Sequence, residues 1–148
     1  MRFIYPALLQ RVSDIEVVVS FRDVPECHTA GVNEADALVE AQDALAEAIA
    51  GRIDDNEPIP RPSARRSGEL LVPVPTEVAS KAALAIACRR SELSQAALAR
   101  ILDIDQETVS QMLNPRHATD TASINRALRI LGSELVLEVR SLAPVNAE

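Results

Sequence analysis

One stretch of the chain, residues 94–114, carries polar side chains at a spacing suited to a helix that reads DNA. In a helix predicted over residues 106–113, Gln106, Thr108 and Gln111 fall on the outward face. A glutamine amide can form two hydrogen bonds with adenine, and a threonine methyl group can contact the methyl group of thymine. We therefore expect these three residues to read bases.

Other polar residues around this helix are suited to contact the DNA backbone. Hydrogen bonds to phosphate oxygens orient a protein on the duplex without reading its sequence. Ser110 and Asn114 are candidates for phosphate or base contacts, and we expect phosphate contacts from Gln95, Arg116 and His117.

Two short helices joined by a tight turn are expected to hold these side chains. Ser94 and Asp105 can each cap a helix, because their side-chain oxygens can accept hydrogen bonds from first-turn amides. Asp103 occupies a turn position where φ should be positive, which Asp tolerates better than most non-glycine residues. The residues expected to face inward are Leu98, Ile101, Leu102, Val109, Met112 and Leu113. This pattern indicates a helix-turn-helix, whose second helix enters the major groove; an ordinary pair of packed helices is the alternative.

Charge is divided unequally along the 148 residues. Residues 1–75 hold 7 basic and 13 acidic side chains, a net charge of −6, and residues 76–148 hold 8 and 9, a net charge of −1. The acidic half indicates either a basic protein partner or simply a solvated surface. With only Phe3, Tyr5 and Phe21 aromatic, the sequence also lacks the stacking residues of many RNA-binding modules.

Few residues suggest catalysis or metal binding. Cys27 and Cys88 are too few for a disulfide framework or a zinc ligand set. Asp14, Glu16 and Asp23 are the only carboxylates on or beside the early strands that a two-metal nuclease could use. We expect no catalytic residue, no metal and no cofactor. No secretory segment opens the sequence and no apolar run approaches ~18 residues, so a cytoplasmic location is expected.

The first half of the sequence predicts a small sheet with one helix packed on it. Strands are predicted over residues 2–10, 15–21 and 27–32. Pro6 cannot donate a ladder hydrogen bond, so the first strand is expected at an edge, or with Pro6 facing outward from one. Asn33 should cap a helix that ends within residues 51–55. An apolar stripe should face the sheet, made of Leu38, Ala41, Leu45, Ala48 and Ile49. The opposite, outer face carries an acidic stripe made of Asp36, Glu40, Asp43 and Glu47.

The second half predicts mainly helices after a proline-rich connector. The predicted segments are the connector 56–68, a strand over 69–75, a helix from a Thr76 cap to about residue 90, the helix-turn-helix, a helix over 121–131 ended by Gly132, and a strand over 134–140. A lone terminal strand must join a sheet in its own chain or pair with a second copy, and we favour a dimer. We expect two domains, 1–75 and 76–148.

The order of these segments resembles the HicB antitoxin family. The resemblance rests on RFIYPALLQ, FRDVPECHTAGVNEADALVEAQDALAEAIAG, EPIPRPS and the LNPRHAT sequence that follows the second helix, and it spans nearly the whole chain. It departs from the family at Glu26, where a glycine is common, and at Asp103.

The resemblance implies an α+β protein with a partial ribonuclease-H-like N-terminal domain and a helix-turn-helix domain with a terminal strand. It further implies an antitoxin that inhibits a HicA-type mRNA interferase, a small basic protein, and represses its own operon. The partners would be this toxin, palindromic operator DNA and further copies of the chain in a dimer or tetramer. The acidic stripe Asp36, Glu40, Asp43 and Glu47 is then a candidate toxin-binding surface, as are the sheet edges and the connector.

Two other functions remain open from the residues alone. A transcription regulator could use its N-terminal sheet to sense a small molecule, although no glycine-rich phosphate loop marks a ligand site. A nuclease is the third hypothesis, since ribonuclease-H-like folds include nucleases.

Overall fold

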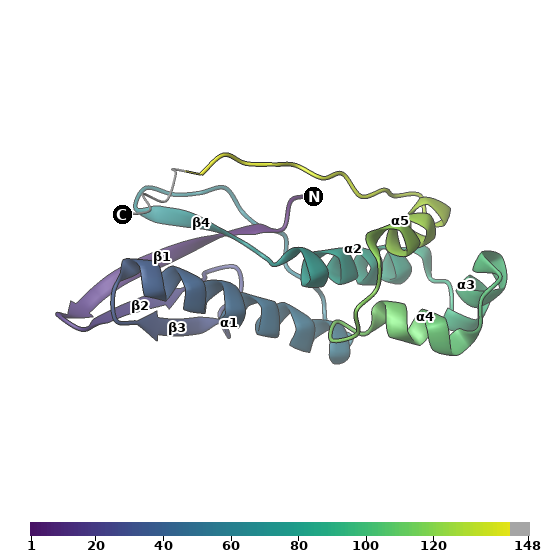
Figure 1. The fold of residues 1–148 in the computed structure, drawn as a ribbon, viewed down its shortest axis with the longest axis horizontal. Coiled ribbons are helices and arrows are strands. Elements are labelled where there is room, and N and C mark those ends of the chain that lie inside the picture. The colour runs from purple at the N-terminus through teal and green to yellow at the C-terminus, as the bar shows by residue number, and fades with distance from the viewer. Residues whose placement is uncertain (143–148) are drawn as a thin grey trace, which may run out of the picture.

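A sheet with one packed helix is followed by a group of helices in the computed structural model, which describes residues 1–142 and confirms the α+β class. The strands in this part of the chain are β1 (Ile4–Ser13), β2 (Glu16–Ser20), β3 (His28–Gly31) and β4 (Glu69–Pro73). The helices are α1 (Glu34–Asp54), α2 (Thr76–Ser91), α3 (Gln95–Leu102), α4 (Gln106–Leu113) and α5 (Thr121–Ile130). Figure 1 shows the sheet and α1 at one end of the molecule and α3 to α5 at the other.

The four strands form one antiparallel sheet in the order β3-β2-β1-β4. The prediction of β1 as an edge strand was wrong, because β1 lies between β2 and β4. Its two halves have different partners: Ile4–Leu8 pairs with β4, whereas β2 pairs with β1 only from Leu8 onward. Pro6 lies in the half of β1 that has a neighbouring strand on one side only, as at the edge of a sheet. A residue without an N–H donor is tolerated at such a position.

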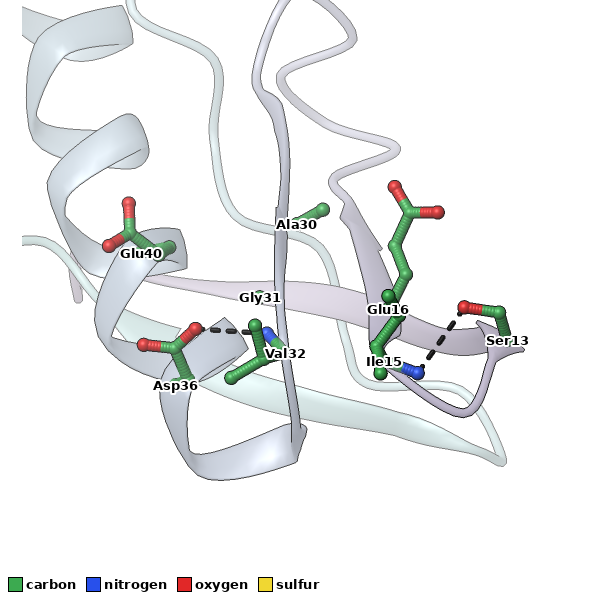
Figure 2. Close-up of a pocket in the computed structure, with 8 residues that line it drawn as sticks. All are labelled: Ser13, Ile15, Glu16, Ala30, Gly31, Val32, Asp36 and Glu40. Carbon is green, nitrogen blue, oxygen red and sulfur yellow. Dashed lines mark hydrogen bonds between the residues drawn. The ribbon is translucent and has the colours of Figure 1, made fainter.

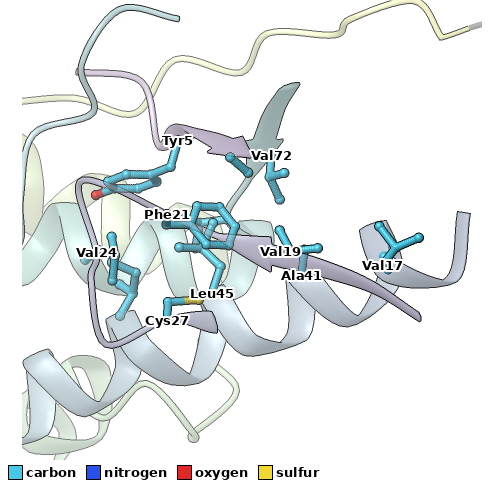
Figure 3. Close-up of a cluster of buried hydrophobic side chains, with 14 residues drawn as sticks. Tyr5, Val17, Val19, Phe21, Val24, Cys27, Ala41, Leu45 and Val72 are labelled. Atoms are coloured by element: carbon cyan, nitrogen blue, oxygen red, sulfur yellow. The ribbon is translucent and has the colours of Figure 1, made fainter. Parts of the chain in front are cut away.

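The core of the N-terminal part lies between this sheet and α1 (Figure 3). Ala41, Leu45 and Ile49 recur every fourth residue on α1 and are fully buried, which confirms the predicted apolar stripe. They face the aromatic rings of Tyr5 and Phe21 and aliphatic side chains of the strands. The alanines let the helix lie close to the sheet. At Gly31 the approach is closest, since a Cβ there would stand 2.3 Å from the amide nitrogen of Ala37.

The proline-rich connector has no helix or strand, as predicted, but side chains bind it to the sheet. The Tyr5 hydroxyl donates a hydrogen bond of 2.7 Å to the carbonyl of Pro60. Asp23 accepts bonds of 2.8 Å from the amide and 2.7 Å from the hydroxyl of Ser63. Arg22 donates to the carbonyl of Ala64 in the connector at 2.5 Å, and a two-pronged ion pair with Glu69 of β4, at 2.7 and 3.1 Å, holds its guanidinium. The connector therefore follows one path over the sheet.

A second core lies among α2 to α5, and α2 joins the two cores. Ala82 on α2 belongs to the first cluster, whereas Leu84 and Ala87 belong to the second. Three residues of α5 and its C-cap are buried in this second core: Ile124, Ala127, Leu128 and Leu131. The boundary between domains at residues 75 and 76 stays a prediction. No helix within residues 1–142 is long and apolar enough to cross a membrane.

Three local predictions need correction. Pro75, not Thr76, is the N-cap of α2, because the Pro75 carbonyl accepts from the amide of Ala79 at 2.9 Å and starts the helix one residue early. Ile101 is 52% exposed instead of facing the core. No strand forms between Gly132 and Leu142; this segment runs extended beyond α5 and contacts the N-terminus through an Arg2–Glu138 ion pair of 3.0 Å.

Candidate nucleic-acid interface and acidic face

Local hydrogen bonds at both ends of the turn hold α3 and α4 as predicted. The Ser94 hydroxyl accepts from the amide of Ala97 at 3.0 Å, and the Asp105 carboxylate accepts from the amide of Thr108 at 2.7 Å. Hydrogen bonding from the side chain and the amide of Thr108 lowers the pKa of Asp105 below its usual value. Asp103 has φ 56° and ψ 47°, the left-handed conformation expected for this turn position.

An aliphatic contact fixes the angle between the two helices. Leu98 and Leu102 from α3 and Val109 and Met112 from α4 are buried in the second core. Ala99 is also buried, and its small side chain lets the helices approach. The prediction of two short helices clamped by these residues is confirmed; Ile101 is the exception.

The eight residues predicted to contact DNA lie on or beside α3 and α4, and six of them are exposed. The exposed ones are Gln95, Gln106, Ser110, Asn114, Arg116 and His117. Gln106 and Ser110 lie four residues apart and so share a face of α4, and Asn114 follows the helix as its C-cap. The Asn114 side-chain oxygen also accepts from the amide of Arg116 at 2.9 Å, which orders the turn after the helix.

Thr108 and Gln111 are half-buried, because both line a hollow of about 260 Å³ between α4 and the start of α5. His117 lines the same hollow, together with Ser123 and Arg126, which the sequence analysis did not select. Arg126 donates a bond of 3.1 Å to the carbonyl of Leu102 at the end of α3. Of the three expected base readers, Gln106 is therefore the most accessible.

The chain's only lysine, Lys81, holds the C-terminal end of α4. Its side chain is 2% exposed, and its ammonium donates to the Gln111 carbonyl at 3.0 Å and to the Thr119 hydroxyl at 2.6 Å. Burial lowers the pKa of Lys81. A positive charge is favourable beside the free carbonyls at a helix C-terminus. Sequence reasoning missed this residue; a single lysine among fourteen arginines, within an alanine-rich helix, was the available signal.

Arg116 contacts the acidic face of α1. Its guanidinium pairs with Glu47 at 3.2 Å and with Asp54. The bond to Asp54 is the main cause that raises the pKa of Arg116. One residue predicted to bind phosphate and one predicted to bind the toxin thus bind each other, across the two halves of the chain.

The other members of the acidic stripe have different surroundings. Asp36 accepts a bond of 2.9 Å from the amide of Val32, and its own amide donates to the Asn33 side chain at 2.9 Å, which confirms Asn33 as the cap of α1. Glu40 and Asp43 are exposed. Within residues 1–142, the side chains of these two form no hydrogen bond or ion pair, so they are open to a partner.

The three carboxylates considered for a nuclease do not converge on a metal site. Asp14 and Glu16 lie at the β1–β2 turn, whereas Asp23 binds Ser63 of the connector. Among the residues that the structure describes, no group of three His, Cys, Asp or Glu side chains could hold a metal ion. Cys27 is buried between strand and helix, and burial raises the pKa of its thiol to about 11.

Comparison with known proteins gives a consistent assignment. Residues 4–83 match the family model described as HicB_like antitoxin of bacterial toxin-antitoxin system. The chain is 38% identical over 133 residues to the Antitoxin HicB of Escherichia coli K12, covering 90% of this chain and 96% of that one. It is 34% identical over 135 residues to Antitoxin HicB 1 of Photorhabdus laumondii, covering 91% and 86%. The match to Antitoxin HicB of Pseudomonas fluorescens is 30% over 126 residues, covering 84% and 86%. The chain belongs to the HicB-like family of antitoxins of bacterial toxin–antitoxin systems.

Proposed function

We propose that this antitoxin inhibits a HicA-type mRNA interferase with its acidic N-terminal half and represses its own operon by binding operator DNA as a dimer or higher oligomer. Its role is regulatory and not catalytic, and the antitoxin and the toxin both act in the cytoplasm. The observation that carries the proposal is the outward polar face of α4, which is held rigidly by the Asp105 cap and by Lys81.

The DNA-binding part of the proposal uses this face of α4. Gln106 and Ser110 are exposed along it, and Asn114 is exposed directly after it. Gln95 is exposed at the start of α3, where first-turn amides favour a phosphate. Gln106 reads a base, with Thr108 and Gln111 next to it at the hollow. His117 and Arg116 lie on the following loop and contact the DNA backbone.

The toxin-binding part uses the charge of the first half. Thirteen acidic against seven basic side chains in residues 1–75 attract a basic protein and raise its association rate. The exposed carboxylates Glu40 and Asp43 of α1 are available for this contact, with Asp36 and Glu47 beside them. An inhibitor of this kind needs only to cover the toxin's active site.

The dimer uses the extended segment that follows α5. Leu137 and Val139 lie two residues apart, as on one face of a strand, and both are more than 80% exposed there, as is Val136 between Leu135 and Leu137. An unpaired extended segment with apolar side chains is a template for strand pairing. Pairing of this segment across a two-fold axis produces the symmetric reader that a palindromic operator requires.

Co-expression with the protein encoded by the adjacent gene tests the proposal. We expect a stable complex with a small basic protein whose mRNA cleavage stops on binding, and sequence-specific binding of the complex or the free antitoxin to the promoter of the operon. A neighbour that is not small and basic, or a complex that does not survive purification, would contradict the antitoxin role proposed here.

A further inference from the structure

A broad hollow of about 410 Å³ lies at the end of the sheet opposite to α3 and α4. Three segments build it: the β1–β2 turn, the end of β3 and the first turns of α1 (Figure 2). Its base is firm, because Gly31 brings β3 against α1 so closely that a Cβ would overlap the backbone of Ala37. Such a site needs little ordering when a partner binds.

Two aliphatic side chains at this hollow are exposed to solvent. Ile15, at the β1–β2 turn, is 76% exposed, and Val32, at the β3–α1 junction, is 60% exposed. They come from different segments and lie on opposite sides of the hollow in Figure 2. Single exposed apolar residues are common on protein surfaces, whereas apolar residues that gather at one hollow mark binding sites.

Carboxylates surround these two side chains. Asp36 is already occupied, since it accepts from the amide of Val32. Glu16 on β2 and Glu40 on α1 are exposed on opposite walls, and in residues 1–142 their side chains have no hydrogen-bond or ion-pair partner. The hollow thus combines two exposed aliphatic side chains with two carboxylates that have no partner in the described part of the chain.

We propose that this hollow receives a lysine or arginine side chain of the toxin, with the aliphatic stem between Ile15 and Val32 and the cationic head at Glu16 and Glu40. Long basic side chains bury their stems on apolar surface while the charged head stays at a polar rim. Arginine in particular is enriched among the residues that dominate interface energy. This inference rests on the proposed toxin-binding function and assigns it to one part of the acidic half, at the hairpin end of the sheet.

The test compares two pairs of substitutions with the same change in net charge. Glu16→Gln with Glu40→Gln removes the carboxylates of the hollow, and Asp55→Asn with Glu77→Gln removes two exposed carboxylates that lie outside the hollow and outside the acidic stripe. The probe is the purified protein encoded by the adjacent gene, titrated against the full-length antitoxin by calorimetry. We expect the first pair to weaken binding about tenfold or more, and the control pair to stay within about twofold of the wild type.

A third variant tests the apolar walls independently of charge. Ile15→Ser replaces an exposed side chain, so it should leave the unfolding temperature unchanged and still weaken toxin binding. At high salt, the variant with Glu16→Gln and Glu40→Gln should still dissociate from the toxin faster than the wild type does. Contacts of a docked charge slow dissociation, whereas long-range attraction, which salt screens, mainly raises the association rate.

Four results would overturn the inference. Equal losses for both carboxylate pairs would mean general attraction to an acidic surface, and no loss for either pair would place the contact elsewhere; the proposed function survives both. A change in oligomeric state with unchanged toxin affinity would show that a second copy of the chain covers the hollow. Absence of any binding by the wild-type chain would contradict the hollow and the proposed function together.

Discussion

The ammonium of Lys81 in α2 lies 3.0 Å from the carbonyl oxygen of Gln111 in α4, so a buried positive charge fixes the C-terminal end of the candidate recognition helix. The same ammonium binds Thr119 on the loop that follows α4. No side-chain nitrogen or oxygen buried within residues 1–142 lacks a hydrogen-bond partner. The buried ammonium thus has two neutral hydrogen-bond acceptors, and through them it joins α2, α4 and the loop.

Replacing Lys81 with methionine should disturb the proposed DNA-binding surface more than the sheet. The change keeps most of the volume but removes the donor to the Thr119 hydroxyl and leaves the Gln111 carbonyl with the Asn114 amide alone, which costs about 1–3 kcal/mol in unfolding free energy. We expect weaker operator binding with unchanged toxin binding, measured by denaturant unfolding and by the two titrations. Arg89→Met, an exposed change on the same helix, is the control. Unchanged operator affinity in Lys81→Met would show that this bond does not position α4.

The contacts of Arg116 predict a competition between α1 and DNA. Because Glu47 and Asp54 already neutralise its guanidinium, Glu47→Gln with Asp54→Asn should free Arg116 for phosphate. An exposed ion pair contributes at most about 1 kcal/mol, so we expect DNA binding to tighten by up to about fivefold on specific and random duplexes alike. Fluorescence anisotropy at two salt concentrations measures this.

Two controls separate this competition from a general loss of negative charge. Glu40→Gln with Asp43→Asn changes the charge of α1 equally without touching Arg116 and should have a smaller effect. In an Arg116→Ala background, the Glu47 and Asp54 changes should gain nothing beyond this control. Equal gains from both pairs of changes would argue against competition for Arg116.

The left-handed conformation of Asp103 predicts that glycine is more stable there. Asp at φ 56° is strained relative to glycine, so Asp103→Gly should raise the free energy of unfolding by about 0.5–1 kcal/mol. Asp103→Val should lower it, because β-branched residues tolerate positive φ poorly. Thermal unfolding of the two variants checks this, and a loss of stability on going to glycine would be the opposite result.

Glu69 predicts a loss of stability in acid. The ion pair with Arg22 is the main cause that lowers the pKa of Glu69 from 4.5 to about 2 in the folded chain. A carboxyl group whose pKa is lower in the folded chain than in the unfolded chain stabilises the fold at pH values above the unfolded-chain pKa. This stabilisation is lost as pH falls from about 4.5 toward 2. Glu69→Gln should therefore flatten the dependence of unfolding free energy on pH in this range. The same slope in both proteins would show that the Glu69–Arg22 pair contributes little.

Features set by neighbouring residues could be predicted from the sequence. The caps at Asn33, Ser94 and Asp105 each depend on one side chain and an amide three residues later, so the helix starts follow from local chemistry. The positive φ of Asp103 likewise follows from its place between two short helices. The apolar stripe of α1 was visible for the same reason, since its spacing alone defines a face.

Features that depend on distant segments could not be predicted. The place of β1 in the sheet depends on how far β2 extends along it, and a proline within β1 says nothing about that. The partners of Lys81 lie 30 and 38 residues away, and those of Arg116 lie 62 and 69 residues away. The segment 134–140 alternates like a strand, but a strand needs a partner, and one chain supplies none within residues 1–142.

The most direct test of the central claim is a titration of the purified antitoxin with its own promoter DNA, in parallel with a random duplex of equal length. We expect the promoter to bind at least ~10³-fold more tightly, with protection of a palindromic site. Gln106→Ala should reduce this preference by about 1–3 kcal/mol at one base position of each half-site, while affinity for the random duplex stays unchanged. Equal affinity of the wild-type chain for both duplexes, or equal losses on both from Gln106→Ala, would contradict the claim that the outward face of α4 reads DNA.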